Sequence, residues 1–175
     1  MVESVEEELE LMMELSEGPP ALSAEAFHRP IEQLFSKDAL CVDVSVTVGE
    51  AVALMREKRY GAIVVTRDGK LDGIFTERDL LVKVVGVIPD FESAPITDVM
   101  TPDPSALRQE DPIVHVAQHM HRGGYRHVPI VDEQDVPVSI VSIKDVMRYI
   151  VNCFPPSVIN VPLEPHRGVA QRDGG

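Results

Sequence analysis

Gly73-Ile74-Phe75-Thr76-Glu77-Arg78-Asp79 is followed 66 positions later by Ser139-Ile140-Val141-Ser142-Ile143-Lys144-Asp145, a second copy of the same pattern. In each copy an apolar run leads into a hydroxyl residue, and an aspartate follows that residue three positions later. The same offset places residues 48–51 on 114–117 and residues 61–65 on 127–131. Residues 30–34 resemble 95–99 at an offset of 65, a shift that a one-residue change in a loop would produce. The chain therefore contains an internal duplication.

Both copies predict the same order of elements. A short helix begins near Val48 or Ile113, an apolar strand follows over 62–66 or 128–132, a second strand spans 71–75 or 136–141, and a helix closes the copy from 76 to about 85 or from 142 to about 151. Asp68-Gly69 indicates a tight hairpin between the first pair of strands. Because the strands are apolar at nearly every position, both faces of each sheet should be buried. We expect an α/β (α+β) fold of two tandem repeats, with short sheets flanked by helices, packed with pseudo-two-fold symmetry around a shared core.

The composition favours a cytoplasmic globular protein of 175 residues, 44% of them hydrophobic and 26% charged. No run approaches the ~20 apolar residues of a spanning helix, and the N-terminus is acidic where a secretory signal would be basic. The formal net charge of −13 argues against a nucleic-acid partner, which would require a basic face. Cys41 and Cys153 form no CxxC pattern, so we interpret both as apolar filler.

Four segments are expected: an acidic N-terminal arm over 1–29, repeats over 30–92 and 93–152, and a flexible C-terminal tail over 153–175. Seven glutamates lie within the first 17 positions, which hold no lysine or arginine. Apolar residues spaced through 5–15 are consistent with one stripe of a helix that packs on a partner, and equally with a frayed acidic tail. Prolines and glycines beyond about 154 disfavour regular structure there.

The sequence resembles a tandem pair of cystathionine-beta-synthase (CBS) domains, also called a Bateman module, over about residues 31–151. The family pattern G-x-x-S/T-x-x-D is matched by Gly73, Thr76 and Asp79. Ser142 and Asp145 match it in the second copy, where Ser139 stands in place of the glycine. Supporting features are Ala51 and Met55, Ala117 and Met120 in the preceding helices, and the strand over 126–132.

This resemblance implies a regulatory module and not an enzyme. Its members commonly pair through their helices into disc-like homodimers, and their clefts commonly bind AMP, ADP, ATP, S-adenosylmethionine or a related adenosyl compound. The ligand would be regulatory, and no cofactor would be required. Binding would favour one relative orientation of the repeats, and a separate effector protein would detect that orientation.

The motif residues suggest how such a ligand would be held. Gly73 would let the ligand approach the backbone, and the helix N-terminus that follows would offer free N–H groups to a phosphate. The Thr76 hydroxyl could join those donors, while Asp79 is placed to accept hydrogen bonds from a ribose diol. The Ser139 side chain would occupy space in the second cleft that glycine leaves open. The expected nucleotide-binding residues are Ala62, Gly73, Thr76, Arg78, Asp79, Arg126, His127, Ser142, Lys144 and Asp145.

The motif residues are also compatible with roles that need no ligand. Thr76 with Asp79, and Ser142 with Asp145, have the spacing of helix capping boxes, which stabilise a helix on their own. The clefts could be empty, leaving a purely structural dimerisation module. His115 and His119 lie four positions apart on a predicted helix and are the weak candidates for a metal site. The sequence contains no recognisable nucleophile–base pair or phosphate-binding lysine loop, so no catalytic residue is expected.

Overall fold

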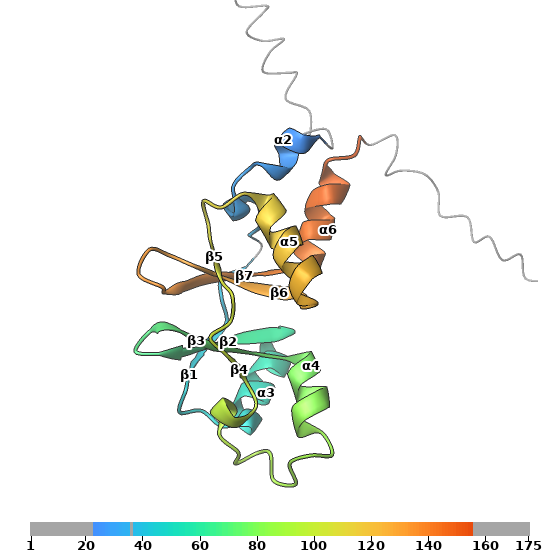
Figure 1. The fold of residues 1–175 in the computed structure, drawn as a ribbon. Helices are drawn as coiled ribbons and strands as arrows, with labels where there is room; N and C mark the ends of the chain where they lie inside the picture. The colour runs from blue at the N-terminus through green and yellow to red at the C-terminus, as the bar shows by residue number, and fades with distance from the viewer. Residues whose placement is uncertain (1–22, 36, 156–175) are drawn as a thin grey trace, which may run out of the picture.

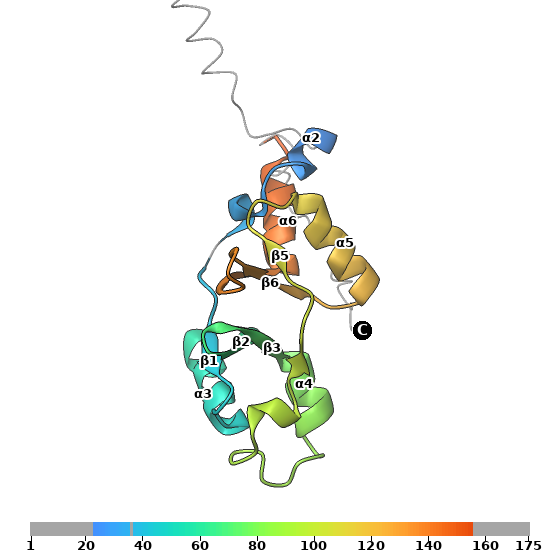
Figure 2. The same ribbon diagram turned by 60° about the vertical axis from the view of Figure 1, so that its left-hand side comes forward.

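The computed structural model describes residues 23–35 and 37–155. Two small sheets lie next to each other at the middle of the molecule, and the helices lie beyond them at the two ends (Figures 1 and 2). The first half contains β1 (Cys41–Asp43), α3 (Val48–Lys58), β2 (Ala62–Arg67), β3 (Lys70–Thr76), α4 (Glu77–Asp79), the π-helix η2 (Leu80–Val84), the 3-10 helix η3 (Ile96–Asp98) and β4 (Thr101–Pro102). The second contains β5 (Leu107–Arg108), α5 (Ile113–Gly123), β6 (His127–Val131), β7 (Pro137–Ser142) and α6 (Ile143–Asn152). Two short helices, α2 (Ala24–Phe27) and the 3-10 helix η1 (Ile31–Leu34), precede them.

The two sheets repeat one topology. In the first, β1 pairs parallel with β2, which pairs antiparallel with β3, and β4 adds an antiparallel edge. In the second, β5 pairs parallel with β6, and β6 pairs antiparallel with β7. Strand β2 also contacts β7 of the other sheet, so the sheets meet face to face. The expected pair of α/β repeats with pseudo-two-fold symmetry is confirmed.

The segments upstream of each copy exchange between the halves. The Ile31 N–H donates to the Asp111 carbonyl oxygen at 2.9 Å, and the Ile96 N–H donates equivalently to the Val46 carbonyl oxygen at 3.1 Å. Ile31 packs with α5 and α6 residues of the second half, whereas Ile96 packs with α3 residues of the first. Each half is therefore completed by a segment that precedes the other copy.

Most of the buried hydrophobic residues form two clusters, one at each sheet, so the core that the sequence predicted to be shared is divided between the two halves except where the sheets pack on each other. Phe75 and Ile63 lie in the first cluster, and Val141 and Val128 occupy the equivalent places in the second. Strands β2 and β6 are nevertheless buried on both faces, as their apolar runs predicted, because one face packs on helices and the other faces the neighbouring sheet.

The offset of 66 holds only for the last strand and helix of each copy. Ala62 pairs with Thr76 and His127 pairs with Ser142, so Ala62 is equivalent to His127 at an offset of 65. The buried positions of α3 and α5 agree, because Ala51 is equivalent to Val116 and not to Ala117. The inserted residue lies in the second hairpin turn, where Asp68 and Gly69 of the first turn are replaced by a longer connection.

The closing helices differ between the copies. The single α-helix expected over 76–85 is instead one turn of α-helix, α4, followed by the π-helix η2, which buries Val84 completely. Helix α6 is regular over its length, as predicted. The predicted acidic helix over 5–15 and most of the predicted tail lie outside the described residues. Within the described part of the arm, the Tyr149 hydroxyl donates to the Ala26 carbonyl oxygen at 2.7 Å, which ties α2 to α6.

Candidate functional site

Two cavities lie at the strand-to-helix junctions, one for each copy of the motif. The first has a volume of about 330 Å³ and the second about 490 Å³. We call them pocket 1 and pocket 2. Pocket 1 is lined by Gly61, Ile74, Thr76, Glu77, Arg78, Asp79, Thr101, Asp103, Pro104, Ser105, Gly123, Gly124, Tyr125, Arg126, His127 and Pro129. Pocket 2 is lined by Lys37, Arg59, Tyr60, Gly61, Ala62, Glu77, Arg126, His127, Ile140, Ser142, Ile143, Lys144, Asp145 and Arg148.

Nine of the ten predicted binding residues line a pocket. Pocket 1 contains Thr76, Arg78 and Asp79; pocket 2 contains Ala62, Ser142, Lys144 and Asp145; Arg126 and His127 line both. The pockets therefore share a wall at the start of strands β2 and β6. The duplication places both motifs at equivalent junctions, which is why residues far apart in sequence gather into two similar sites.

Gly73 lines neither pocket. A Cβ at this position would overlap the Met100 sulfur, so the missing side chain makes room for Met100. Ser139 is also buried away from pocket 2, and its hydroxyl donates to the Lys37 carbonyl oxygen at 2.9 Å. The expectation that Ser139 narrows the second cleft is wrong, because its side chain instead hydrogen-bonds to Lys37, in the segment that leads into the first half.

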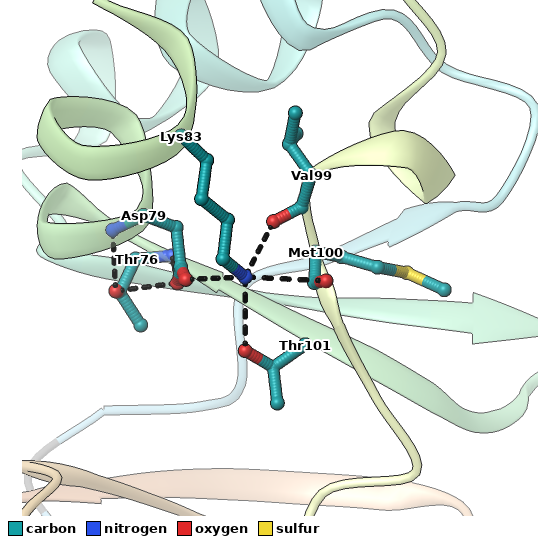
Figure 3. A network of polar contacts seen from close by, with 6 residues as sticks. All are labelled: Thr76, Asp79, Lys83, Val99, Met100 and Thr101. Carbon is teal, nitrogen blue, oxygen red and sulfur yellow. Dashed lines mark hydrogen bonds and ion pairs between the residues drawn. The ribbon is translucent and has the colours of Figure 1, made fainter.

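Thr76 and Asp79 form a complete capping box at the start of α4 (Figure 3). Asp79 Oδ2 accepts hydrogen bonds from the Thr76 N–H at 2.9 Å and from the Thr76 hydroxyl at 2.7 Å. Asp79 Oδ1 forms an ion pair of 2.8 Å with Lys83 Nζ. A carboxylate has about four lone-pair positions, and three of them are occupied here, so Asp79 can accept one further hydrogen bond from a ligand in pocket 1.

Lys83 links this junction to the segment that crosses back between the halves. Its ammonium donates to the Val99 carbonyl oxygen at 2.9 Å, and more weakly to Met100 and Thr101 at 3.4 Å (Figure 3). Thr101 is itself part of the lining of pocket 1. One cation thus joins the pocket aspartate to the backbone that leads into β4.

The second junction repeats the capping box with a different cation. Asp145 Oδ2 accepts from the Ser142 N–H at 2.8 Å and from the Ser142 hydroxyl at 2.5 Å. Asp145 Oδ1 accepts from Arg148 at 3.0 Å, so an arginine three positions later replaces the lysine four positions later. The capping role that the sequence suggested is present at both junctions.

His127 lies in the wall shared by the two pockets. Burial lowers the pKa of its imidazole, and the positive charge of Arg126 lowers it further. Glu77 and Asp145 oppose this shift, whereas Lys144 adds to it. Because His127 lines both cavities, a charged ligand in either pocket would shift the pKa of its imidazole.

Several pocket residues escaped the sequence prediction. Lys37, Arg59 and Tyr60 line pocket 2, and Asp103 and Tyr125 line pocket 1. Only the duplication could have indicated any of these residues, because Tyr60 and Tyr125 occupy equivalent positions after their helices. All five residues lie outside the G-x-x-S/T-x-x-D motif.

The metal alternative gains no support from the geometry. The described part of the chain contains no group of three or more histidine, cysteine, aspartate or glutamate residues placed to hold a metal ion. His119 Nδ1 instead lies 3.3 Å from the Tyr125 hydroxyl.

Among the described residues, no helix combines the length and apolar character needed to cross a bilayer.

The family model for the CBS domain matches residues 31–86 and again residues 96–152. The chain is 31% identical over 109 residues to the CBS domain-containing protein CBSCBSPB1 of Arabidopsis thaliana, an alignment that covers 62% of this chain and 20% of that protein. The chain thus matches only about a fifth of the length of such relatives.

Solved structures share the fold. The CBS-domain protein ATU1752 from Agrobacterium tumefaciens is 31% identical, with a TM-score of 0.62 over 68% of this chain and 97% of that one. The CBS pair of protein MJ0100, solved with 5′-methylthioadenosine and S-adenosyl-L-methionine, is 23% identical, with a TM-score of 0.61 over 68% and 97%. CBSX2, solved with AMP, is 22% identical, with a TM-score of 0.58 over 69% and 94%. The chain therefore belongs to the CBS domain family and carries two CBS domains in tandem.

Proposed function

We propose that this chain is a non-catalytic regulatory module that binds an adenosine-type ligand at the strand-to-helix junctions and transmits its presence to a partner protein. The observation that carries this proposal is the pair of equivalent pockets, each with an aspartate and a hydroxyl residue at a capped helix start. The complexes of MJ0100 and CBSX2 with adenosyl compounds support the same ligand class for this fold.

The chemistry of pocket 1 suits an adenosine ligand. Ile74, Pro129 and Tyr125 provide apolar surface on which an adenine ring can pack. The Asp79 carboxylate can accept one hydrogen bond from a ribose hydroxyl beside its present contacts, and a second one if the ribose displaces Lys83 from Oδ1. We therefore place the base toward the apolar wall and the ribose toward the helix junction.

Transmission would use the Lys83 link. A ribose at Asp79 would compete for the carboxylate that holds Lys83 Nζ at 2.8 Å, and Lys83 also holds the Val99 carbonyl oxygen. Ligand binding would therefore shift the crossing segment and, with it, the orientation of the two repeats. An effector protein that contacts both repeats would detect the change.

A homodimer is the assembly that we propose. Leu81 on η2 and Val85, the residue that follows η2, are exposed, and so are their counterparts Met147 and Val151 on α6. Apolar side chains repeated on both closing helices favour a partner that covers both helices at once. The same faces support a second candidate function, a dimerisation module whose pockets hold no ligand.

Isothermal titration of the nucleotide-stripped protein tests the ligand class. AMP, ATP, S-adenosylmethionine and 5′-methylthioadenosine would be compared with GMP and GTP, which match the phosphates and ribose but not the base. We expect saturable binding of at least one adenosine compound, with the guanosine compounds at least tenfold weaker. Absence of binding across the adenosine panel would overturn the proposed sensor and leave the dimerisation module.

A further inference from the structure

The two pockets differ sharply in charge although they arose by duplication. Pocket 2 gathers five cationic side chains against two carboxylates: Lys37, Arg59, Arg126, Lys144 and Arg148 against Glu77 and Asp145. Pocket 1 gathers two cationic side chains against three carboxylates: Arg78 and Arg126 against Glu77, Asp79 and Asp103. Pocket 2 thus carries a positive formal charge within a chain whose net charge is −13.

The difference arises at equivalent positions of the repeats. Arg59 ends helix α3 where Gly124 ends α5, and both adopt the left-handed conformation. Arg148 of pocket 2 is equivalent to the exposed Val82 of the first copy. Glu77 of the first copy is equivalent to the uncharged Ile143 of the second. At the positions of Arg59 and Arg148, pocket 2 therefore has a cation where the other copy has an uncharged residue.

The cations also differ in their availability. Arg78 of pocket 1 donates to the Gly124 carbonyl oxygen at 2.8 Å. Lys144, its counterpart in pocket 2, has no ion pair or hydrogen-bond partner from its side chain within the part of the chain that the structure describes. The same holds for Arg59 in that part of the chain. These exposed side chains line pocket 2 and are available to an anionic ligand.

A phosphate group carries up to two negative charges and three acceptor oxygens, and its hydrogen bonds to lysine and arginine are charge-assisted. A sulfonium or an uncharged thioether gains nothing from such donors and is repelled by none of the carboxylates of pocket 1. We propose that pocket 2 selects the phosphorylated adenosine ligand, whereas pocket 1 accepts an adenosyl ligand without phosphate. This inference rests on the proposed function and adds a charge selectivity to each of its two sites.

Titration of the full chain with AMP and with 5′-methylthioadenosine tests the inference through the matched pair Lys144→Ala and Arg78→Ala. Lys144→Ala should weaken AMP binding at least tenfold and should leave 5′-methylthioadenosine within about twofold. AMP affinity should also fall steeply as salt is raised, since the cations are exposed. Lys70→Ala removes an exposed cation from outside both pockets and controls for net charge.

The assignment is overturned if Arg78→Ala weakens AMP more than Lys144→Ala, or if Lys70→Ala weakens it as much. Pyrophosphate provides a readout that does not depend on adenine. Should every adenosine compound fail to bind, the proposed function fails, yet pyrophosphate binding that is lost in Lys144→Ala still supports an anion-selective pocket 2. Absence of pyrophosphate binding at low salt in that case overturns the charge selectivity as well.

Discussion

The Lys83 ammonium lies 2.8 Å from Asp79 Oδ1, and the same ammonium donates to the Val99 carbonyl oxygen at 2.9 Å. Asp79 belongs to the junction that lines pocket 1, whereas Val99 belongs to the segment that crosses between the halves. The Lys83 side chain therefore connects pocket 1 to the segment that crosses between the halves. Its replacement should affect both stability and ligand response.

Lys83→Met keeps the apolar stem and removes the charge. We expect the free energy of unfolding to fall by about 1–2 kcal/mol, because a charged donor to two backbone carbonyls and a carboxylate is lost. Chemical denaturation measures the change. Lys58→Met, which removes only the exposed pair with Glu57, is the control and should cost under about 0.5 kcal/mol. Equal losses in the two variants would show that the Lys83 contacts contribute no more to stability than the exposed pair of Lys58 and Glu57 does.

Gly73→Ala should destabilise the protein by about 1–3 kcal/mol, since the new Cβ would overlap the Met100 sulfur. The test is a double-mutant cycle with Met100→Ala, which removes the obstructing side chain. We expect the double variant to lose clearly less than the sum of the single variants. Strict additivity would mean that Gly73 is needed for a reason other than Met100.

The exchange of segments predicts that the halves unfold together. Ile31 and Ile96 are both fully buried, each in the half that belongs to the other copy. Ile31→Ala and Ile96→Ala should each cost about 2–5 kcal/mol and should shift one common unfolding transition. Calorimetry that resolves two transitions, with each variant lowering only one of them, would contradict this coupling.

The lowered pKa of His127 leads us to predict that the free energy of unfolding falls on mild acidification. Burial and the Arg126 charge lower its pKa in the folded protein, so the fold favours the neutral ring. The stabilisation is complete above the unfolded pKa of about 6.5 and is lost as pH falls from there toward the lowered folded pKa. His127→Gln should flatten the loss seen in urea unfolding between about pH 7.5 and about pH 5, whereas the exposed His121→Gln should not. Parallel profiles for wild type and His127→Gln would remove His127 as the cause.

The exposed apolar side chains of the closing helices predict a dimer. Light scattering during gel filtration should report twice the chain mass of 19.3 kDa. Met147→Glu should shift the protein toward the monomer, because it places a charge on an apolar face that is 51% exposed at Met147 in one chain. A wild-type monomer at the concentrations used would refute the proposed assembly.

The repeat, the order of elements and the two capped strand-to-helix junctions were predictable because they follow from local patterns. The apolar strands, the Asp68-Gly69 turn and the two capping boxes each depend on residues a few positions apart. Duplication then placed both motifs at equivalent junctions. The pairing of Ala62 with Thr76 and of His127 with Ser142 shows that these two predicted binding residues occupy equivalent positions.

The features that the sequence did not predict depend on contacts between distant segments of the chain. The resemblance of Ala51 to Ala117 suggested an ungapped offset, but burial of Val116 shows that the inserted residue lies in the later hairpin turn. The cations of pocket 2 were missed because Lys37, Arg59 and Arg148 come from three separate segments. Only the fold brings them around one cavity. The packing of Gly73 against Met100 likewise has no local signal.

The most direct test of the central claim is titration of the best-binding adenosine compound against the matched variants Asp79→Ala and Asp145→Ala. Both substitutions remove an equivalent capping carboxylate, so their structural costs should be similar, about 0.5–2 kcal/mol. Thermal melts would verify that both variants remain folded. We predict that one substitution weakens the ligand at least tenfold while the other changes it by less than about twofold. Wild-type affinity in both folded variants would contradict a ligand held at the strand-to-helix junctions.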